Sequence, residues 1–147
     1  MNGVESKESD NLKQGVIFAI CRGGEIVLQK RLNPDKSYYG YTIIPGGKAK
    51  VGEKLEDALV REVREETGVL VKKFKFIGSV DVITEKDNHY IHNLFLVTEF
   101  DGKVENNREL DAQIFSAPFA EAKLICKHSF SQQILDLIEL ELSGQNR

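Results

Sequence analysis

The chain has 147 residues, with 20 basic and 23 acidic side chains, a formal net charge of −3 and 41% hydrophobic residues. These values are typical of one soluble globular domain, and the small acidic excess argues against a general nucleic-acid binder. The sequence contains no apolar run of about 18 residues, so no membrane-spanning helix is expected. Its two cysteines, Cys21 and Cys126, are too few for a disulfide scaffold, and we expect reduced thiols in a cytoplasmic protein.

The N-terminal third predicts a tail followed by a β-hairpin. Residues 1–11 are polar without periodicity and are expected to be a disordered tail, so that a single domain spans residues 12–147. Val16–Cys21 and Ile26–Arg31 are strand-like runs separated by a turn that contains two glycines. This arrangement predicts two antiparallel strands joined by the turn.

A loop, a short strand and a helix are expected next. Residues 32–40 are rich in turn-forming residues and predict a loop, and Tyr41–Ile44 predict a short strand that stops at a Pro-Gly-Gly sequence. Lys54–Thr67 carries apolar residues at helical spacing. Gly68 directly follows and suits a left-handed helix end.

The second half of the chain predicts further strands and then two helices. Apolar and aromatic patterns predict strands at Phe74–Ile83, Tyr90–Phe100 and Gln113–Ser116, and helices at Pro118–Leu124 and Phe130–Leu142. The loop between the first two of these strands is expected to close a hairpin. Strands with helices inserted between them predict an α/β domain around a mixed sheet.

The helix predicted at Lys54–Thr67 changes character along one face. Leu55 and Leu59 begin an apolar stripe, and at about 100° per residue Glu62 and Glu66 continue it, with Glu65 about 60° to one side of Glu62. Carboxylates that are three or four residues apart repel each other. A helix that keeps such acids on its inward side is well suited to hold a cation, and oxygen ligands without Cys or His favour Mg²⁺ or Mn²⁺.

The alternative interpretation of the same pattern is a solvated charged face. Arg61 and Arg64 would then balance Glu65 and Asp57 through pairs four residues apart. Spacing on this helix does not decide between a metal site and an exposed charged surface.

A longer pattern includes this helix. From Gly47 to Val69 the sequence matches the form G-x5-E-x7-R-E-U-x-E-E-x-G-U, where U is aliphatic, at every specified position. This resembles the Nudix box. The resemblance implies the Nudix fold, an α/β/α sandwich around a mixed β-sheet in which the box forms a loop, a helix and a second loop. It also implies an enzyme that hydrolyses a nucleoside diphosphate linked to another group, with Mg²⁺ or Mn²⁺ as cofactor.

The resemblance also assigns roles within the box. The metal ligands would be Glu62, Glu65, Glu66 and a backbone carbonyl such as that of Gly47. The catalytic group would be Glu53, Arg61, Glu62 and Glu65. Glu53 would act as a further ligand or as an orienting base, and Arg61 would pair with a box carboxylate and fix its rotamer.

The general base is not settled by the box. It is either a box glutamate or an acid from a later loop, and the acids available outside the box are Glu85, Asp87, Glu105, Glu109 and Asp111. Glu109 and Asp111 are preferred because they precede the strand predicted at Gln113–Ser116. The alternative for each of them is an ordinary surface charge.

Substrate selection is expected outside the acidic part of the box. Tyr39, near the strand that enters the box, could stack on a nucleobase. Lys30, Arg31 and Lys48 could reach phosphates. The alternatives are that the tyrosine packs in the core and that the basic side chains are simply solvated.

The resemblance favours a MutT-like enzyme that converts a (deoxy)nucleoside triphosphate to a monophosphate and pyrophosphate and so clears damaged nucleotides. The alternative substrates are ADP-ribose, a nucleotide sugar or an RNA 5′ end. A non-catalytic nucleotide-binding module is a further alternative, although such members usually lose box glutamates that this chain keeps. We expect a nucleotide as the partner, no membrane, nucleic acid at most as an RNA 5′ end, and a monomer or homodimer.

Overall fold

A computed structural model describes residues 12–83, 89–106 and 111–144 of the chain. The expected N-terminal tail and the expected hairpin loop at 84–88 lie outside these residues. The strands are β1 (Leu12–Arg22), β2 (Glu25–Arg31), β3 (Thr42–Ile43), β4 (Gly46–Lys48), β5 (Leu70–Ile83), β6 (His89–Asp101) and β7 (Ala112–Pro118). The helices are α2 (Leu55–Thr67), α3 (Phe119–Ile125) and α4 (Ser129–Gly144).

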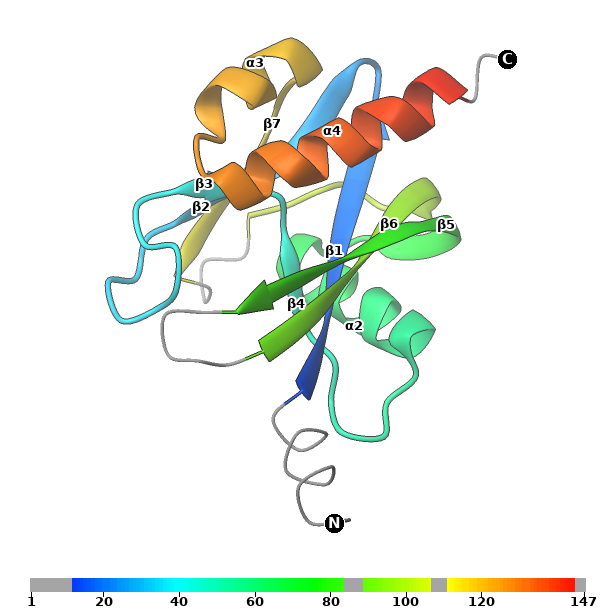
Figure 1. Ribbon diagram of the computed structural model, residues 1–147. Coiled ribbons are helices and arrows are strands. Elements are labelled where there is room, and N and C mark those ends of the chain that lie inside the picture. The colour runs from blue at the N-terminus through cyan, green and yellow to red at the C-terminus, as the bar shows by residue number, and fades with distance from the viewer. Residues whose placement is uncertain (1–11, 84–88, 107–110, 145–147) are drawn as a thin grey trace.

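The predicted N-terminal hairpin is confirmed at its turn, and its two strands then separate. Cys21 pairs with Ile26 next to the turn. Farther from the turn, β1 runs parallel to β6, while β2 lies between β3 and β7 in antiparallel pairing. β5 pairs with β6 on the far side. The sheet is therefore mixed, as expected, and the strands diverge along β1 and β2 (Figure 1).

One strand of this sheet was not expected from the sequence. β3 ends before the Pro-Gly-Gly sequence, as expected, yet Gly46–Lys48 form a further strand, β4, which pairs antiparallel with β1. The pairing brings two backbones unusually close, because a Cβ placed on Gly46 would lie 2.4 Å from the carbonyl oxygen of Val16. The glycine permits a strand that propensity alone disfavours.

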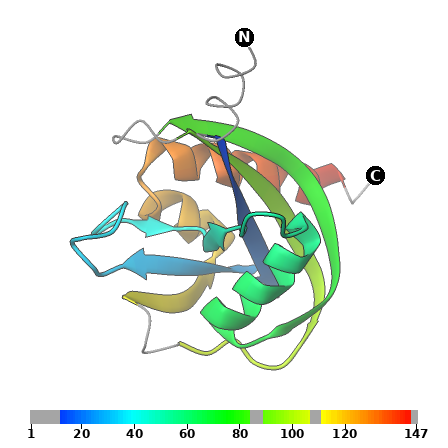
Figure 2. The same cartoon turned by 90° about the horizontal axis from the view of Figure 1, so that it is seen from below.

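Alternation along β1 divides the core into two layers. Val16 and Phe18 pack with apolar residues of α2, whereas Ile17 and Ala19 pack with residues of α3 and α4. Figures 1 and 2 show α2 on one side of β1 and α4 on the other. This is the expected α/β/α sandwich, because successive strand residues point to opposite faces and both faces are covered.

The helix of the box begins and ends close to its predicted limits. α2 begins at Leu55 and ends at Thr67, and its buried residues include Ala58 and Val63. Gly68 has φ 82°, the left-handed conformation expected of it, and its N–H donates to the carbonyl of Arg64. The buried face of α2 packs against apolar residues of β1.

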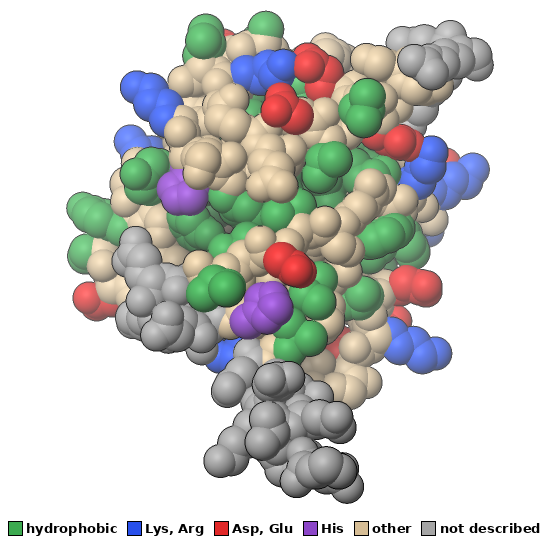
Figure 3. Space-filling view, in the orientation of Figure 1, with side chains coloured by type: hydrophobic (Ala, Val, Ile, Leu, Met, Phe, Trp, Pro, Cys, Tyr) green, Lys and Arg blue, Asp and Glu red, His purple; other side chains and the backbone are tan. Residues whose placement is uncertain are grey.

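The opposite layer is formed mainly by α4. Its buried apolar residues are Ile134, Leu135 and Ile138. Figure 3 shows apolar side chains gathered in a band across the face on which α4 lies. Among the described residues, no helix is both long and apolar enough to cross a membrane.

Candidate metal centre

The backbone of β4 lies directly against the side chain of Glu62 in α2. A Cβ placed on Gly47 would meet the carboxylate carbon of Glu62 at 2.1 Å, so only glycine leaves room for this carboxylate. Glu62 is 8% exposed, and burial raises the pKa of its carboxyl group against the opposing effect of Arg61. The contact joins the glycine loop and the helix of the box into one site.

Arg61 connects the acidic residues of the box to one another. Its Nε and Nη2 donate to Glu53 at 2.9 and 2.8 Å, and its Nη1 donates to Glu62 at 2.8 Å and to Glu65 at 3.2 Å. Nη2 also donates to the carbonyl of Lys48 in β4. A planar guanidinium can hold several oxygens in fixed directions. Arg61 therefore links Glu53, Glu62 and Glu65 through hydrogen bonds.

Glu53 is the anchor for this arginine. It accepts from Arg61 through both carboxylate oxygens and from the backbone N–H of Lys50. The Arg61 hydrogen bond, and then the Lys50 hydrogen bond, lower the pKa of Glu53 to about 2. The Glu53 carboxylate is thus ionised at neutral pH and fixed in the loop before α2.

Glu66 lies on the other side of the same helix face, against β2. Gln29 donates from Nε2 to Glu66 Oε2 at 3.2 Å. Burial, and then the nearby Glu62, raise the pKa of Glu66 to about 7, while Arg31 and the Gln29 hydrogen bond act in the opposite direction. The carboxylate of Glu62 thus opposes the ionisation of the partly buried Glu66.

Glu65 differs from the sequence-based expectation. Its side chain is 54% exposed, so the inward acidic stripe consists of Glu62 and Glu66, and Glu65 borders it from the solvent side. Across the described ranges, no three His, Cys, Asp or Glu side chains converge as a ready set of metal ligands. The box carboxylates contact Arg61 and Gln29 instead.

The residues present nevertheless fit a hard divalent cation. The donors are carboxylate oxygens of one helix beside a glycine backbone with no side chain in the way, and Mg²⁺ prefers oxygen ligands. Bringing a cation to Glu62 and Glu66 would also relieve the repulsion that opposes their ionisation. The arrangement therefore suits chemistry at a phosphate group, which carries the opposite charge to the cation.

The basic residues named from the sequence divide between two faces of β2. Arg31 shares a face with Gln29 and acts on Glu66 through its charge, and its Nε donates to the carbonyl of Ser37. Lys30 points to the opposite face, where it lines a pocket of about 620 Å³ beside α3. The structure thus brings Arg31, but not Lys30, to the acidic residues.

Aromatic rings from three distant segments meet near β4. Tyr38 and Tyr41 contact the ring of His128 edge-on, with ring centroids 5.0 and 5.1 Å apart. The His92 ring lies 5.5 Å from Tyr90 in a stacked arrangement and 5.3 Å from the ring of Phe130. The ammonium of Lys48 lies 5.6 Å from the centre of the Tyr90 ring, so this aromatic cluster adjoins the box loop. Tyr39 is not buried with it and is 55% exposed.

Of the two preferred acids outside the box, Asp111 is described and Glu109 lies outside the described residues. Asp111 accepts from the Asn33 side chain at 2.7 Å, and its backbone carbonyl accepts from Leu32. It therefore holds the loop that follows β2. Glu105 is exposed, and its N–H donates to the carbonyl of Thr67 at the end of α2.

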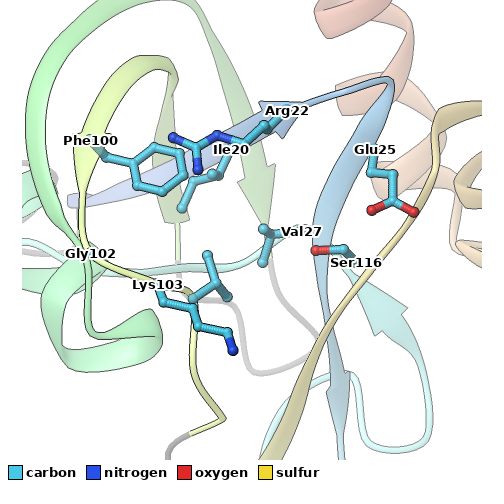
Figure 4. A pocket seen from close by; sticks show the side chains of 9 residues that line it. Ile20, Arg22, Glu25, Val27, Phe100, Gly102, Lys103 and Ser116 are labelled. Atoms are coloured by element: carbon cyan, nitrogen blue, oxygen red, sulfur yellow. The ribbon is translucent and has the colours of Figure 1, made fainter.

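A second pocket, of about 330 Å³, lies beyond the end of α2. Figure 4 shows Arg22 lying across Phe100, and the guanidinium carbon is 4.2 Å from the ring centre. The residues that line this pocket do not include the box carboxylates. It is thus separate from the acidic residues.

Sequence reasoning missed two features of this region. Gln29 carried no signal because a glutamine in a strand reads as a surface residue, whereas it is buried and contacts Glu66. The aromatic cluster was missed because its members come from segments far apart in the chain. Burial lowers the pKa of the His92 ring.

Comparisons with known proteins bear on the family and the fold of this chain. A family model described as NUDIX domain matches residues 12–138. The putative 8-oxo-dGTP diphosphatase YtkD of Bacillus subtilis (strain 168) is 36% identical over 80 residues, which are 54% of this chain and 46% of YtkD. The ADP-ribose pyrophosphatase of Methanocaldococcus jannaschii is 34% identical over 88 residues, 58% of this chain and 50% of that protein.

The matched segment thus spans about half the length of these two curated relatives. Among solved structures, the MutT NUDIX hydrolase from Burkholderia pseudomallei superposes with a TM-score of 0.74 at 23% identity and covers 86% of this chain and 98% of that one. At this identity the likeness shows a shared fold.

Proposed function

Because this chain belongs to the Nudix family, whose model matches residues 12–138, we propose that it is a metal-dependent hydrolase of a nucleoside diphosphate linked to another group. The contact between Gly47 and the Glu62 carboxylate carries the proposal. It makes a glycine backbone and a partly buried acidic helix face parts of one site, and a solvated charged face does not require such a contact.

The proposed cation is Mg²⁺ or Mn²⁺, since Nudix hydrolases generally use a divalent metal. Glu62, Glu65 and Glu66 would hold it, together with the backbone at Gly47. When bound, the cation supplies positive charge against the phosphate oxygens. Oxygen donors without a nearby thiol or imidazole support this choice over zinc.

The chain's own residues would prepare the site. Arg61 holds Glu62 and Glu65 in position through Nη1 and is itself held by Glu53. Glu65, the most exposed of the three acids, is open to a water molecule and to substrate from the solvent side. We assign it the role of accepting the proton from the attacking water, because a carboxylate within reach of that water is a suitable base.

The preferred substrate is a (deoxy)nucleoside triphosphate, cleaved to a monophosphate and pyrophosphate. Two observations support it: the match to a relative named putative 8-oxo-dGTP diphosphatase, and the aromatic rings beside the box loop, which offer surfaces for a base. The match to a relative named ADP-ribose pyrophosphatase supports ADP-ribose as the second candidate. The retention of Glu62, Glu65 and Glu66 argues against a non-catalytic module.

The test is product analysis with the purified protein, Mg²⁺ and a panel of nucleotides. The panel contains standard and 8-oxo (deoxy)nucleoside triphosphates, ADP-ribose, UDP-sugars and an RNA with a 5′ triphosphate. Formation of monophosphate and pyrophosphate from a triphosphate, abolished by EDTA, is the expected result. Turnover confined to ADP-ribose would establish the second candidate, and no turnover of any compound would contradict the proposal.

A further inference from the structure

A buried glutamine of β2 contacts the metal centre proposed above. Gln29 is 1% exposed and lies opposite Ile43 of β3 and Ile114 of β7, so both neighbouring strands fix its backbone. Its side chain points to the α2 side of the sheet, as does that of Val27 two residues earlier. A side-chain amide that is almost fully buried requires an explanation beyond packing.

The two polar atoms of the Gln29 side-chain amide differ in their hydrogen bonding. Nε2 donates to Glu66 Oε2 at 3.2 Å. Oε1 is buried and has no hydrogen-bond partner among the residues that the structure describes. An unpaired buried acceptor destabilises the folded chain, and an apolar residue of similar size would avoid it. The fold alone therefore gains little from an amide at this position, and its defined interaction is with Glu66.

We propose that Gln29 is a positioning residue for the metal centre, and that its amide holds one carboxylate oxygen of Glu66 so that the other is directed to the cation. A carboxylate has two oxygens and a rotatable end, so a donor on one of them fixes the direction of the other. Arg61 does the same for Glu62 from the helix. The site is thus held from two sides, by α2 and by β2. This inference rests on the proposed role of Glu66 as a metal ligand.

The test is Mn²⁺ binding to the full chain without substrate, measured by calorimetry, together with thermal unfolding in EDTA. The variants are Gln29→Leu, Glu66→Gln and the double variant. We expect Gln29→Leu to weaken Mn²⁺ binding by roughly 10-fold or more, as removal of groups that orient ligands does, with an unchanged or higher Tm. In the Glu66→Gln background the same change should alter affinity by less than about 2-fold, because its effect acts through Glu66.

Gln132→Leu is the matched control. Gln132 also has a partly buried side-chain amide, but its Nε2 donates to the backbone carbonyls of Lys123 and Cys126. It should lower the Tm and leave Mn²⁺ affinity unchanged. If Gln29→Leu does not fold, Gln29→Met, which keeps the length of the side chain, is measured in the same way and has the same expected result.

The possible failures are distinguishable. If Glu66→Gln weakens Mn²⁺ binding but Gln29→Leu does not, the role of Gln29 is wrong and the metal centre stands. An equal loss from Gln29→Leu with and without Glu66 would also overturn it, because the effect would then be structural. If Glu66→Gln itself leaves Mn²⁺ affinity unchanged, Glu66 is not a ligand and the proposed metal centre fails at that residue.

Discussion

Gly47 lies so close to Glu62 that a methyl group on its α-carbon would overlap the carboxylate, with 2.1 Å between the added carbon and the carboxylate carbon. The two residues are 15 positions apart, one in β4 and one in α2. The antiparallel pairing of β4 with β1 holds the glycine there. Glycine at this position therefore serves the site, and not a turn.

Alanine substitutions at Gly47 and at its neighbour Gly46 test whether the glycine at position 47 serves the site. Gly47→Ala should displace the Glu62 carboxylate and reduce Mg²⁺-dependent activity and Mn²⁺ affinity by roughly 10- to 100-fold. Gly46→Ala should instead reduce the free energy of unfolding, by about 1–3 kcal/mol, because its methyl group would collide with the Val16 carbonyl. Calorimetry and urea unfolding separate the two effects. Equal loss of metal affinity in both variants would contradict the contact as a feature of the site.

The hydrogen bonds of Arg61 predict that lysine cannot replace it. Lysine lacks the planar fork that reaches Glu53, Glu62 and Glu65 together. Arg61→Lys should lower kcat/KM by roughly 10- to 100-fold although the charge is kept. Arg64→Lys, an exposed arginine on the same helix, should behave like the wild type. Normal activity of Arg61→Lys would show that only the charge matters.

Glu65 offers the clearest separation of activity from stability. Because its side chain is largely exposed, Glu65→Gln should keep the Tm of the wild type while lowering kcat by roughly 100- to 10,000-fold. Glu56→Gln, in the first turn of the same helix, is the control and should keep full activity. Turnover by Glu65→Gln close to that of the wild type would remove this residue from the catalytic group.

The raised pKa of Glu66 predicts that the free energy of unfolding decreases as pH rises. Between its ordinary value of 4.5 and about 7, the folded state holds a proton on Glu66 that the unfolded state has released. The free energy of unfolding contributed by this group therefore falls as pH rises through that window. In EDTA, the wild type should lose stability relative to Glu66→Gln between pH 4.5 and 7.

Metal binding should show the opposite trend. A cation requires the ionised carboxylate, so Mn²⁺ affinity should increase as pH rises through about 7 and binding should release protons. Urea unfolding at several pH values and calorimetry in two buffers measure both effects. Parallel stability profiles of the wild type and Glu66→Gln would show that Glu66 ionises as it does in the unfolded chain.

Tyr39 provides a test of base stacking, since it is 55% exposed and its removal should leave the Tm unchanged. Tyr39→Ala should raise KM for the preferred nucleotide by about 5-fold or more, as loss of one stacking contact does, with kcat preserved. Tyr39→Phe keeps the ring and should keep KM. An unchanged KM in Tyr39→Ala would leave the aromatic cluster around His128 as the surface available to a base.

Local features of this protein were predictable from its sequence. The spacing of Leu55 and Leu59 with Glu62 and Glu66 placed the acids on the apolar face of α2, because a helix converts spacing into direction by its own geometry. The helix end at Gly68 followed from its need for a left-handed conformation. The box motif extended these local inferences to a family and its fold.

Other features depended on contacts between distant segments. Propensity did not predict β4, because pairing with β1 stabilises a strand of two glycines and a lysine that has little preference for extended structure of its own. Glu65 was expected to face inward, yet it lies at the solvent-exposed border, where the ion pair with Arg61 holds it.

The sequence by itself thus determined the helix, its acidic face and the family, because each depends on residues within one short segment. The tertiary structure decided how that face is held. Gln29 reaches Glu66 across 37 positions, Gly47 admits Glu62 because β4 pairs with β1, and rings from three segments meet at His92 and His128. Such contacts depend on the packing of the whole chain, which spacing within one segment does not encode.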